Sequence, residues 1–213
     1  MNKKHKKSSG REFRAFATEM QAQEGEGMIV TGYATTFDQP YLLFEDRDGY
    51  KFFEKIDAHA FDNTDMSDVI MQYDHQGRVF ARIKNGTLQL SVDRKGLRIE
   101  ADLSGTDIGQ QLYQEIKGGY TDKMSFAFTV AEDEYIGIEN ESGFEELRTI
   151  KAIKKLYDVS AVSIPANDTT SISARMLGEG VIPKQIAERL RAREQRQRDI
   201  LKFKIKIRKE LSR

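Results

Sequence analysis

Short segments in which apolar and polar residues alternate recur along much of this chain of 213 residues. A period of two is the pattern of a β-strand, because successive side chains of a strand point to opposite faces of a sheet. Three such strands are predicted at residues 79–83, 87–92 and 97–103. Their separators, residues 84–86 and 93–96, end in glycine and predict hairpins. Many short strands with few helices predict a mainly β fold, an antiparallel barrel or a sandwich.

One segment of the body has the periodicity of a helix instead. Residues 106–117 begin with Thr106 and Asp107, either of which can cap a helix, and two glycines follow the segment. We predict one helix here, and further along an acidic loop over residues 132–146. The apolar residues of the helical segment fall on one stripe, as they do in a helix that covers a core: Ile108, Leu112, Tyr113 and Ile116.

The strand predicted over residues 123–130 carries the first candidate for a chemical role. Ser125 lies on the face opposite the bulky apolar residues, where a rigid strand holds its hydroxyl in place, as a nucleophile requires. A serine without any chemical role is the ordinary alternative. Lys123 shares that face and is a competing base, although its side chain is expected to lean into solvent. The face that meets the core is predicted to consist of Met124, Phe126, Phe128 and Val130.

Histidine and aspartate supply candidates for a base and its partner. His75 follows an apolar strand and is the best general base among three histidines, although a solvated or structural histidine is the common case. Its neighbour Asp74 is expected to point to the opposite face, so it is a poor partner. Asp158 interrupts an apolar strand, where a buried carboxylate is unfavourable unless it is paired. It therefore either faces solvent or accepts a hydrogen bond from an imidazole N–H.

The charges of the chain are concentrated by sign. Residues 1–15 hold six bases and one acid, and residues 184–213 hold twelve bases and four acids. Because the whole chain has 34 bases and 34 acids, the part between has a net charge of −13. We predict a disordered basic tail at residues 1–11, a body at 12–177, and a basic, helical extension at 178–213. Basic ends on an acidic body favour partner binding or self-association over nucleic-acid binding, and a solvated helix and tail is the alternative.

Several kinds of site are missing from the sequence. The chain has no cysteine, which excludes disulfides and thiolate metal sites and suits a reducing compartment. No calcium-loop pattern and no glycine-rich phosphate loop occurs, so we predict no metal and no cofactor. No apolar run approaches the ~20 residues of a membrane helix, and the basic N-terminus lacks the apolar segment of a secretory signal. We therefore expect a soluble intracellular protein with no membrane partner.

Four segments of the chain, residues 32–38, 73–75, 123–128 and 156–167, are informative when they are taken together. They resemble the prohead (capsid maturation) protease family of tailed bacteriophages. The resemblance covers residues 12–175, nearly the whole body, and rests on the order and spacing of the segments rather than on any one of them. The family is similar in fold to the herpesvirus assemblin serine proteases, which implies an orthogonal antiparallel β-barrel surrounded by a few helices.

The resemblance also implies a role for each candidate residue. It makes Ser125 the nucleophile, His75 the general base and Asp158 the acid that orients the base. Asp158 departs from the assemblins, which have a histidine as the third member, but phage members more often have a carboxylate there. The loop after the Asp158 strand implies an oxyanion hole formed by backbone, with the N–H of Ala166 or Asn167 as donor.

The function implied is that of a serine endopeptidase that cleaves scaffold segments of the capsid precursor, and itself, inside the assembling prohead in the host cytoplasm. The capsid protein is then both partner and substrate, and a homo-oligomer is expected. The alternative is a non-enzymatic capsid assembly or scaffolding factor on the same fold. A nucleic-acid-binding protein that uses the basic extension is a third reading, which the acidic body opposes.

Overall fold

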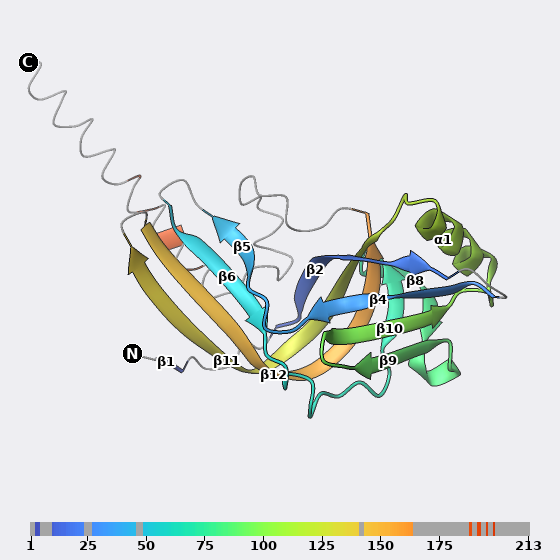
Figure 1. The fold of residues 1–213 in the computed structure, drawn as a ribbon, viewed down its shortest axis with the longest axis horizontal. Coiled ribbons are helices and arrows are strands. Elements are labelled where there is room, and N and C mark those ends of the chain that lie inside the picture. Colours follow the sequence, from blue (N-terminus) through green and yellow to red (C-terminus); the bar gives the residue numbers. More distant parts are fainter. Residues whose placement is uncertain are drawn as a thin grey trace, which may run out of the picture.

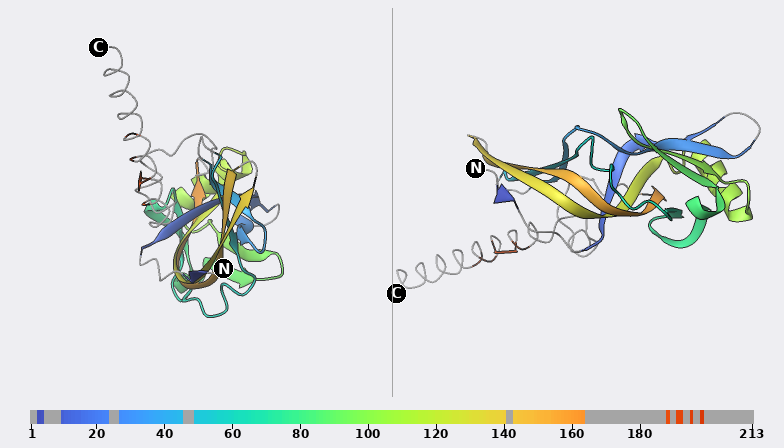
Figure 2. Two further views of the ribbon diagram at one scale, coloured as in Figure 1. Left: turned by 90° about the vertical axis from the view of Figure 1, so that its left-hand side faces the viewer. Right: turned by 90° about the horizontal axis from the view of Figure 1, so that it is seen from below.

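A long antiparallel hairpin, formed by β11 (Lys123–Asn140) and β12 (Gly143–Val162), runs through the computed structural model and carries most of its other strands. Figure 1 shows this hairpin spanning the molecule, with α1 (Asp107–Lys117) at one end. The right-hand view of Figure 2 shows its tip projecting away from that end. The structure describes residues 3–4, 10–23, 27–45, 49–140 and 143–163, and five later helical residues, Glu188, Arg191, Ala192, Gln195 and Arg198.

The other strands of the described residues divide between two sheets. One sheet is built on the β11–β12 hairpin, and the other has the strand order β3-β4-β10-β9. A short 3₁₀ turn, η1 (Ile83–Asn85), connects β8 to β9. The strands that complete the two sheets are β1 (Lys3–Lys4), β2 (Glu12–Glu19), β3 (Gln21–Ala22), β4 (Ile29–Thr36), β5 (Tyr41–Glu45), β6 (Lys51–Ile56), β7 (Ile70–Tyr73), β8 (Gln76–Arg82), β9 (Leu88–Val92) and β10 (Gly96–Asp102).

The hairpin has different neighbours at its two ends. Near the tip, β6 pairs in parallel with residues 145–150 of β12, and β5 pairs with β6. Near the base, β7 pairs in parallel with residues 158–161 of β12, and β2 pairs with residues 123–128 of β11. A strand of 20 residues is long enough for β6 and β7 to share it end to end. The base of the hairpin is therefore the centre of a four-strand layer, β2-β11-β12-β7.

The main hydrophobic core lies where that layer meets the second sheet and α1. Its buried members include Val30 of β4, Ile99 of β10 and Leu112 of α1, together with residues of β11 and β12. Burial of such apolar side chains is the chief favourable term in folding. The predicted core face of β11 is confirmed, because all four of its residues are buried: Met124, Phe126, Phe128 and Val130.

Several elements with strong local signals form as predicted. The helix α1 begins after Thr106, whose hydroxyl accepts a hydrogen bond from the backbone N–H of Gly109 at 3.1 Å, and it ends at Gly118. The three short strands are present as β8, β9 and β10. The β9–β10 turn is a hairpin, closed by a 3.0 Å hydrogen bond from the N–H of Asp93 to the carbonyl of Gly96.

Two predicted connections are wrong. Most of the acidic segment 132–146 is strand, because it forms the distal part of the β11–β12 hairpin. Its alternate residues Asp133 and Tyr135 are buried, and the charge of Asp133 is paired with Arg148 rather than solvated. Residues 84–86 do not form a hairpin either: β8 and β9 lie in different sheets, and the chain passes between them through η1.

The predicted orthogonal antiparallel barrel with surrounding helices is only partly correct. The described residues are mainly β, but their strands form two sheets and no closed barrel. The pairing is also not wholly antiparallel, because β6 and β7 both run parallel to β12. A parallel neighbour needs a long connection, and residues 57–69 supply one between β6 and β7. Within the described part of the chain α1 is the one complete α-helix.

The predicted end segments are described only in part. Lys3 and Lys4 form β1, paired with Tyr135 and Glu134 of β11. The other residues of 1–9 lie outside the described part of the chain. In the predicted extension 178–213, the five described residues are helical and the rest are outside the description. No helix among the described residues is long and apolar enough to cross a membrane.

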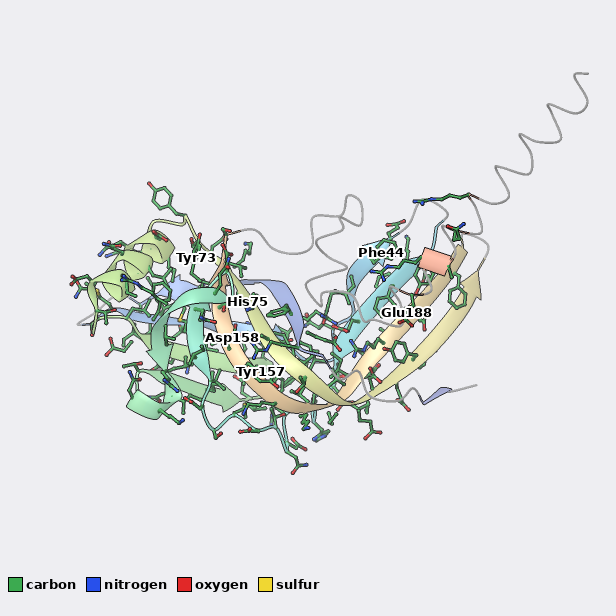
Figure 3. All side chains as sticks on the ribbon, turned by 180° about the vertical axis from the view of Figure 1, so that it is seen from behind. Phe44, Tyr73, His75, Tyr157, Asp158 and Glu188 are labelled. Carbon is green, nitrogen blue, oxygen red and sulfur yellow. The ribbon has the colours of Figure 1, made fainter. Side chains whose placement is uncertain are left out.

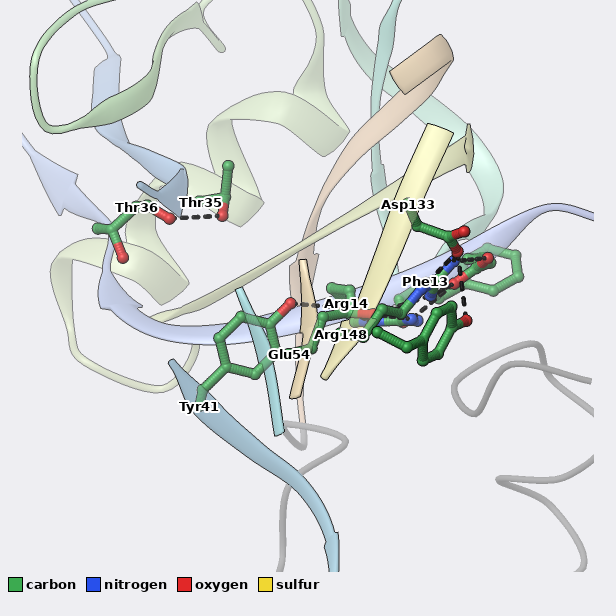
Figure 4. A network of polar contacts seen from close by, with 10 residues as sticks. Phe13, Arg14, Thr35, Thr36, Tyr41, Glu54, Asp133 and Arg148 are labelled. Carbon is green, nitrogen blue, oxygen red and sulfur yellow. Dashed lines mark hydrogen bonds and ion pairs between the residues drawn. The ribbon is translucent and has the colours of Figure 1, made fainter. Parts of the chain in front are cut away.

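Five charged side chains lie buried where β2, β6, β11 and β12 meet (Figure 4). Arg148 contacts Glu12, Glu54 and Asp133 at 2.6, 2.8 and 2.7 Å. Arg14 contacts Glu12 at 2.6 Å and Glu54 at 2.5 Å. Burial alone raises the pKa of Glu12, but the positive charges of Arg148 and Arg14 outweigh it and hold that pKa at about 2. We call these five residues the buried ion network.

Candidate active site

Ser125 occupies the centre of the four-strand layer. It lies opposite Ala15 of β2 on one side and Ser160 of β12 on the other. Directly opposed residues of antiparallel strands share a face, so Ser125 and Ser160 lie on the face away from Phe126. The side chains that precede and follow Ser125 are fully buried in the core, and Ser125 itself is 2% exposed. The strand therefore fixes where its hydroxyl lies.

His75 is held by a two-residue turn between β7 and β8. Tyr73 pairs with Gln76, and the intervening Asp74 and His75 both have left-handed backbones, with φ of 48° and 58°. Two successive positive φ angles are typical of a type I′ hairpin turn, and Asp and His tolerate them better than most residues do. The turn is tied to the end of β12, because Asp74 accepts hydrogen bonds from the N–H and the hydroxyl of Ser163 at 3.0 and 2.9 Å.

Asp158 is buried rather than solvated, which settles the alternative that its sequence left open. It is 2% exposed and lies opposite Ala127 of β11, two positions along the face from Ser125. Its Oδ1 atom is 2.6 Å from Nδ1 of His75, and the hydroxyl of Ser160 donates to the same oxygen at 2.7 Å. Figure 3 shows His75 beside Asp158. The buried carboxylate thus has two hydrogen-bond partners.

The imidazole of His75 connects the other two side chains. Its Nε2 atom is 2.6 Å from Oγ of Ser125, and its Nδ1 atom faces Asp158. A carboxylate only accepts, so Nδ1 carries the proton and Nε2 is left to accept the Ser125 hydroxyl. This order of hydroxyl, imidazole and carboxylate, each within hydrogen-bond reach of the next, is the arrangement that activates a serine. Sequence positions 75, 125 and 158 therefore form one polar constellation.

A family model described as Caudovirus prohead serine protease matches residues 16–180, about three quarters of the sequence and all three side chains of this constellation. The chain belongs to the caudovirus prohead serine protease family. The predicted family is thereby confirmed, and at the level of the family the protein is a phage prohead serine peptidase. No curated protein and no solved structure matches the chain. The implied likeness in fold to herpesvirus assemblins stays a prediction.

In this prohead protease Lys123, the competing base, contacts Asp122 and not Ser125. The ammonium of Lys123 lies 2.9 Å from the carboxylate of Asp122, whereas the Ser125 hydroxyl is engaged with His75. A lysine acts as the base of a serine only when its amine is neutral and in contact with the hydroxyl. The geometry therefore favours His75 as the partner of Ser125.

Two residues that contact this constellation, Phe13 and Ser160, were not identified as site residues from the sequence. Phe13 of β2 packs its ring against His75 at 4.7 Å between centroids, with the rings tilted by 65°. Ser160 donates to Asp158, as described above. The spacing of Ser160, two residues after Asp158 in a strand, places both on one face, so alternation alone could have found it. Phe13 carries no such signal, because its contact depends on the pairing of β2 with β11.

The remaining predicted features of the protease site are tested only in part. Ala166 and Asn167, the predicted oxyanion donors, lie outside the described residues. The described part of the chain has no group of three or more His, Asp and Glu side chains that could hold a metal ion.

Proposed function

We propose that Ser125, His75 and Asp158 form the catalytic triad of this prohead protease. The observation that supports this most directly is that one imidazole has hydrogen-bonding contacts of 2.6 Å on both nitrogens, to the serine and to the aspartate. In acylation, Oγ of Ser125 attacks the carbonyl carbon of the scissile peptide while Nε2 of His75 takes the hydroxyl proton. Asp158 accepts the hydrogen bond from the Nδ1–H of His75 and stabilises the imidazolium that forms.

The rest of the cycle uses the same three groups. The imidazolium gives its proton to the leaving amine, which releases the first product and leaves an acyl ester on Ser125. A water molecule then gives a proton to His75 and attacks the ester carbon. The returning proton frees the Ser125 hydroxyl, and the second product leaves with a new carboxyl group.

The oxyanion of each tetrahedral intermediate needs donors, and we assign the backbone N–H of Ala166 or Asn167 to this role. The position of Ser163 supports the assignment. Ser163, which precedes residues 164–167 in the sequence, is hydrogen-bonded to Asp74, and Asp74 precedes His75 in the same turn. Pro165 has no N–H and is not a donor.

We infer that the substrate is the capsid precursor, and that cleavage of its scaffold segments and of the protease itself occurs inside the assembling prohead. Membership of the prohead protease family supports this substrate class. We further propose that the protease acts as a homo-oligomer and that its basic extension, residues 184–213, binds an acidic surface of the capsid precursor. The net charge of +8 that twelve bases and four acids give this segment supports such binding.

Co-expression of the protease with a capsid precursor tests the triad and the substrate together. Ser125→Ala should leave the fold intact and abolish both precursor cleavage and self-cleavage, observed as intact masses by mass spectrometry. Ser91→Ala is the matched control, because Ser91 is an exposed serine of β9 in the other sheet. A fluorophosphonate probe should label the wild type and not the Ser125→Ala variant. Cleavage that survives in Ser125→Ala would remove the assignment.

The same experiment separates the alternatives. If the wild type leaves the precursor intact and resists the probe while proheads still assemble, the protein is a scaffolding factor and not a peptidase. Deletion of residues 184–213 should reduce incorporation into proheads while cleavage in solution persists. Normal incorporation of that truncated chain would contradict the role of the extension. Light scattering of the purified protein tests the oligomer, and a monomeric mass at working concentration counts against it.

A further inference from the structure

Ser160 is a buried hydroxyl that the catalytic cycle described above does not use. It is 0% exposed, lies on β12 directly opposite Ser125, and pairs with Gln72 of β7 on its other side. Its side chain shares a face with Asp158 because the two are separated by one residue in the strand. Its hydroxyl donates to Oδ1 of Asp158 at 2.7 Å. This bond, and not contact with solvent, satisfies the hydroxyl.

The bond falls on the one carboxylate atom that also faces His75. Nδ1 of His75 is 2.6 Å from Oδ1, so two donors converge on a single oxygen. A carboxylate can rotate about its last side-chain bond, and a partial rotation would turn its oxygen out of line with Nδ1 of His75. A donor fixed to the same strand favours the rotation in which one oxygen faces both the imidazole and the Ser160 hydroxyl. It also offsets part of the cost of burying the negative charge.

We propose that Ser160 is a positioning residue that acts through Asp158: it holds the carboxylate in the orientation that fixes the tautomer of His75. The proposal rests on the triad of the proposed function. Ser160 itself touches neither the scissile bond nor the imidazole in this account. Its effect on the reaction therefore passes entirely through Asp158. The proposal can be tested by combining a Ser160 variant with an Asp158 variant.

Kinetics on a peptide that spans a cleavage site provide the first test. Ser160→Ala should lower kcat by about ten-fold, the effect expected from the loss of one hydrogen bond to a charged group. KM should stay within two-fold, because no contact with the substrate is lost. Ser160→Cys has nearly the volume of serine but is a weak donor. It should behave like Ser160→Ala if the hydrogen bond matters, and like the wild type if only packing matters.

A double-mutant cycle with Asp158→Asn tests whether the effect passes through Asp158. In the Asp158→Asn background, Ser160→Ala should cost less than two-fold in kcat, because the carboxylate it positions is already absent. An equal ten-fold loss in both backgrounds would overturn the proposal and assign Ser160 to packing. So would a wild-type kcat in Ser160→Ala. Thermal unfolding of each variant shows whether the compared proteins are folded at the assay temperature.

A spectroscopic readout keeps this inference separate from the peptidase assignment. The proton on Nδ1 of His75 should give a downfield resonance in the proton NMR spectrum of the free wild-type protein, and Asp158→Asn should abolish it. Ser160→Ala should shift or broaden that resonance, whereas Ser91→Ala should not. If the wild type cleaves nothing but the resonance responds to Ser160→Ala, the proposed function fails and the positioning role stands. If the enzyme is active and the resonance is unchanged, the positioning role fails alone.

Discussion

At the scale of single residues, the chemistry depends on which nitrogen of His75 carries the proton. The contact with Asp158 assigns that proton to Nδ1, and the contact with Ser125 then uses the lone pair of Nε2. The opposite tautomer would present an N–H to the Ser125 hydroxyl and could not take its proton. The role of Asp158 is therefore to select a tautomer as well as to stabilise a charge.

Asp158→Asn tests this role, because an amide matches the carboxylate in shape but can donate its own N–H to Nδ1. The proton of His75 then moves to Nε2, and the imidazole no longer serves as a base. We expect kcat to fall by about 10⁴-fold, as it does when the acid of a serine-protease triad is changed to its amide. The peptide cleavage assay measures the loss, and circular dichroism should report an unchanged fold. Activity within ten-fold of the wild type would show that Asp158 is not the third member.

The candidate side chains could be named from the sequence, but their geometry could not. Ser125 and Asp158 interrupt apolar strands, and His75 is one of only three histidines, so residue type and pattern point to them. Their contact depends on the register of β11, β12 and β7, which is set by packing between distant segments. The same register brings Phe13 to His75, so no local pattern could reveal it. Register is a property of the sheet and not of any one strand.

At the scale of elements, the turn between β7 and β8 sets the position of His75. Asp74 and His75 both have positive φ, a conformation that costs about 1–3 kcal/mol at a residue other than glycine. The two hydrogen bonds from Ser163 to Asp74 offset part of this cost and attach the turn to the end of β12. Because β12 also carries Asp158, a single strand end fixes both the base and its orienting acid.

Asp74→Ala should loosen this turn. Alanine keeps the left-handed backbone poorly and loses both bonds to Ser163, so we expect the free energy of unfolding to fall by about 1–2 kcal/mol. The cleavage rate should fall with it, because His75 is no longer held in line with Ser125. Asp74→Asn is the matched control, since asparagine tolerates positive φ and can still accept from Ser163. Denaturant unfolding and the peptide assay measure both effects, and an Ala variant as stable and active as the Asn variant would refute the role of the turn.

Helices and strands formed as predicted where the residues that define them lie close together in the sequence. The helix α1 has its cap, its stripe and its terminating glycines within a dozen residues, and it forms as predicted. The distal part of the β11–β12 hairpin was missed because a run of acidic residues is typical of a solvated loop. In the fold, the buried acid Asp133 of that run is neutralised by Arg148 across the hairpin. Pairing with β6 and burial of Tyr135 then favour a strand, and neither can be read from the segment itself.

At the scale of the whole molecule, the buried ion network joins the part of the fold that carries the triad to the rest of the hairpin. Glu12 and Arg14 belong to β2, whose intervening residue Phe13 packs on His75. Glu54 belongs to β6, and Arg148 lies next to it on β12. Breaking a buried pair by removing one partner leaves an uncompensated charge, which is strongly unfavourable. The network therefore makes the packing of β2 over the site depend on strands near the tip of the hairpin.

This network should make the protein unstable in acid. The folded state holds the pKa of Glu12 at about 2, against an ordinary value of 4.5, so the folded protein binds fewer protons than the unfolded chain between these limits. The stabilisation that Glu12 contributes is fully present above about pH 4.5 and is lost as the pH falls toward 2. A depression of this size corresponds to the order of 3 kcal/mol. Stability should therefore fall steeply with acidification over this range.

The free energy of unfolding, measured by denaturant at pH 6 and at pH 3, tests the linkage. Glu12→Gln removes the titrating group and leaves Arg148 short of a partner, so the variant should be less stable at pH 6 yet lose less on going to pH 3. Glu132→Gln is the matched control, because Glu132 is an exposed acid on β11 and the change of an acid to its amide is the same. The free energy of unfolding of Glu132→Gln should fall between pH 6 and pH 3 by as much as that of the wild type. If the stability of Glu12→Gln also falls in parallel with that of the wild type, the acid sensitivity lies in carboxylates other than Glu12.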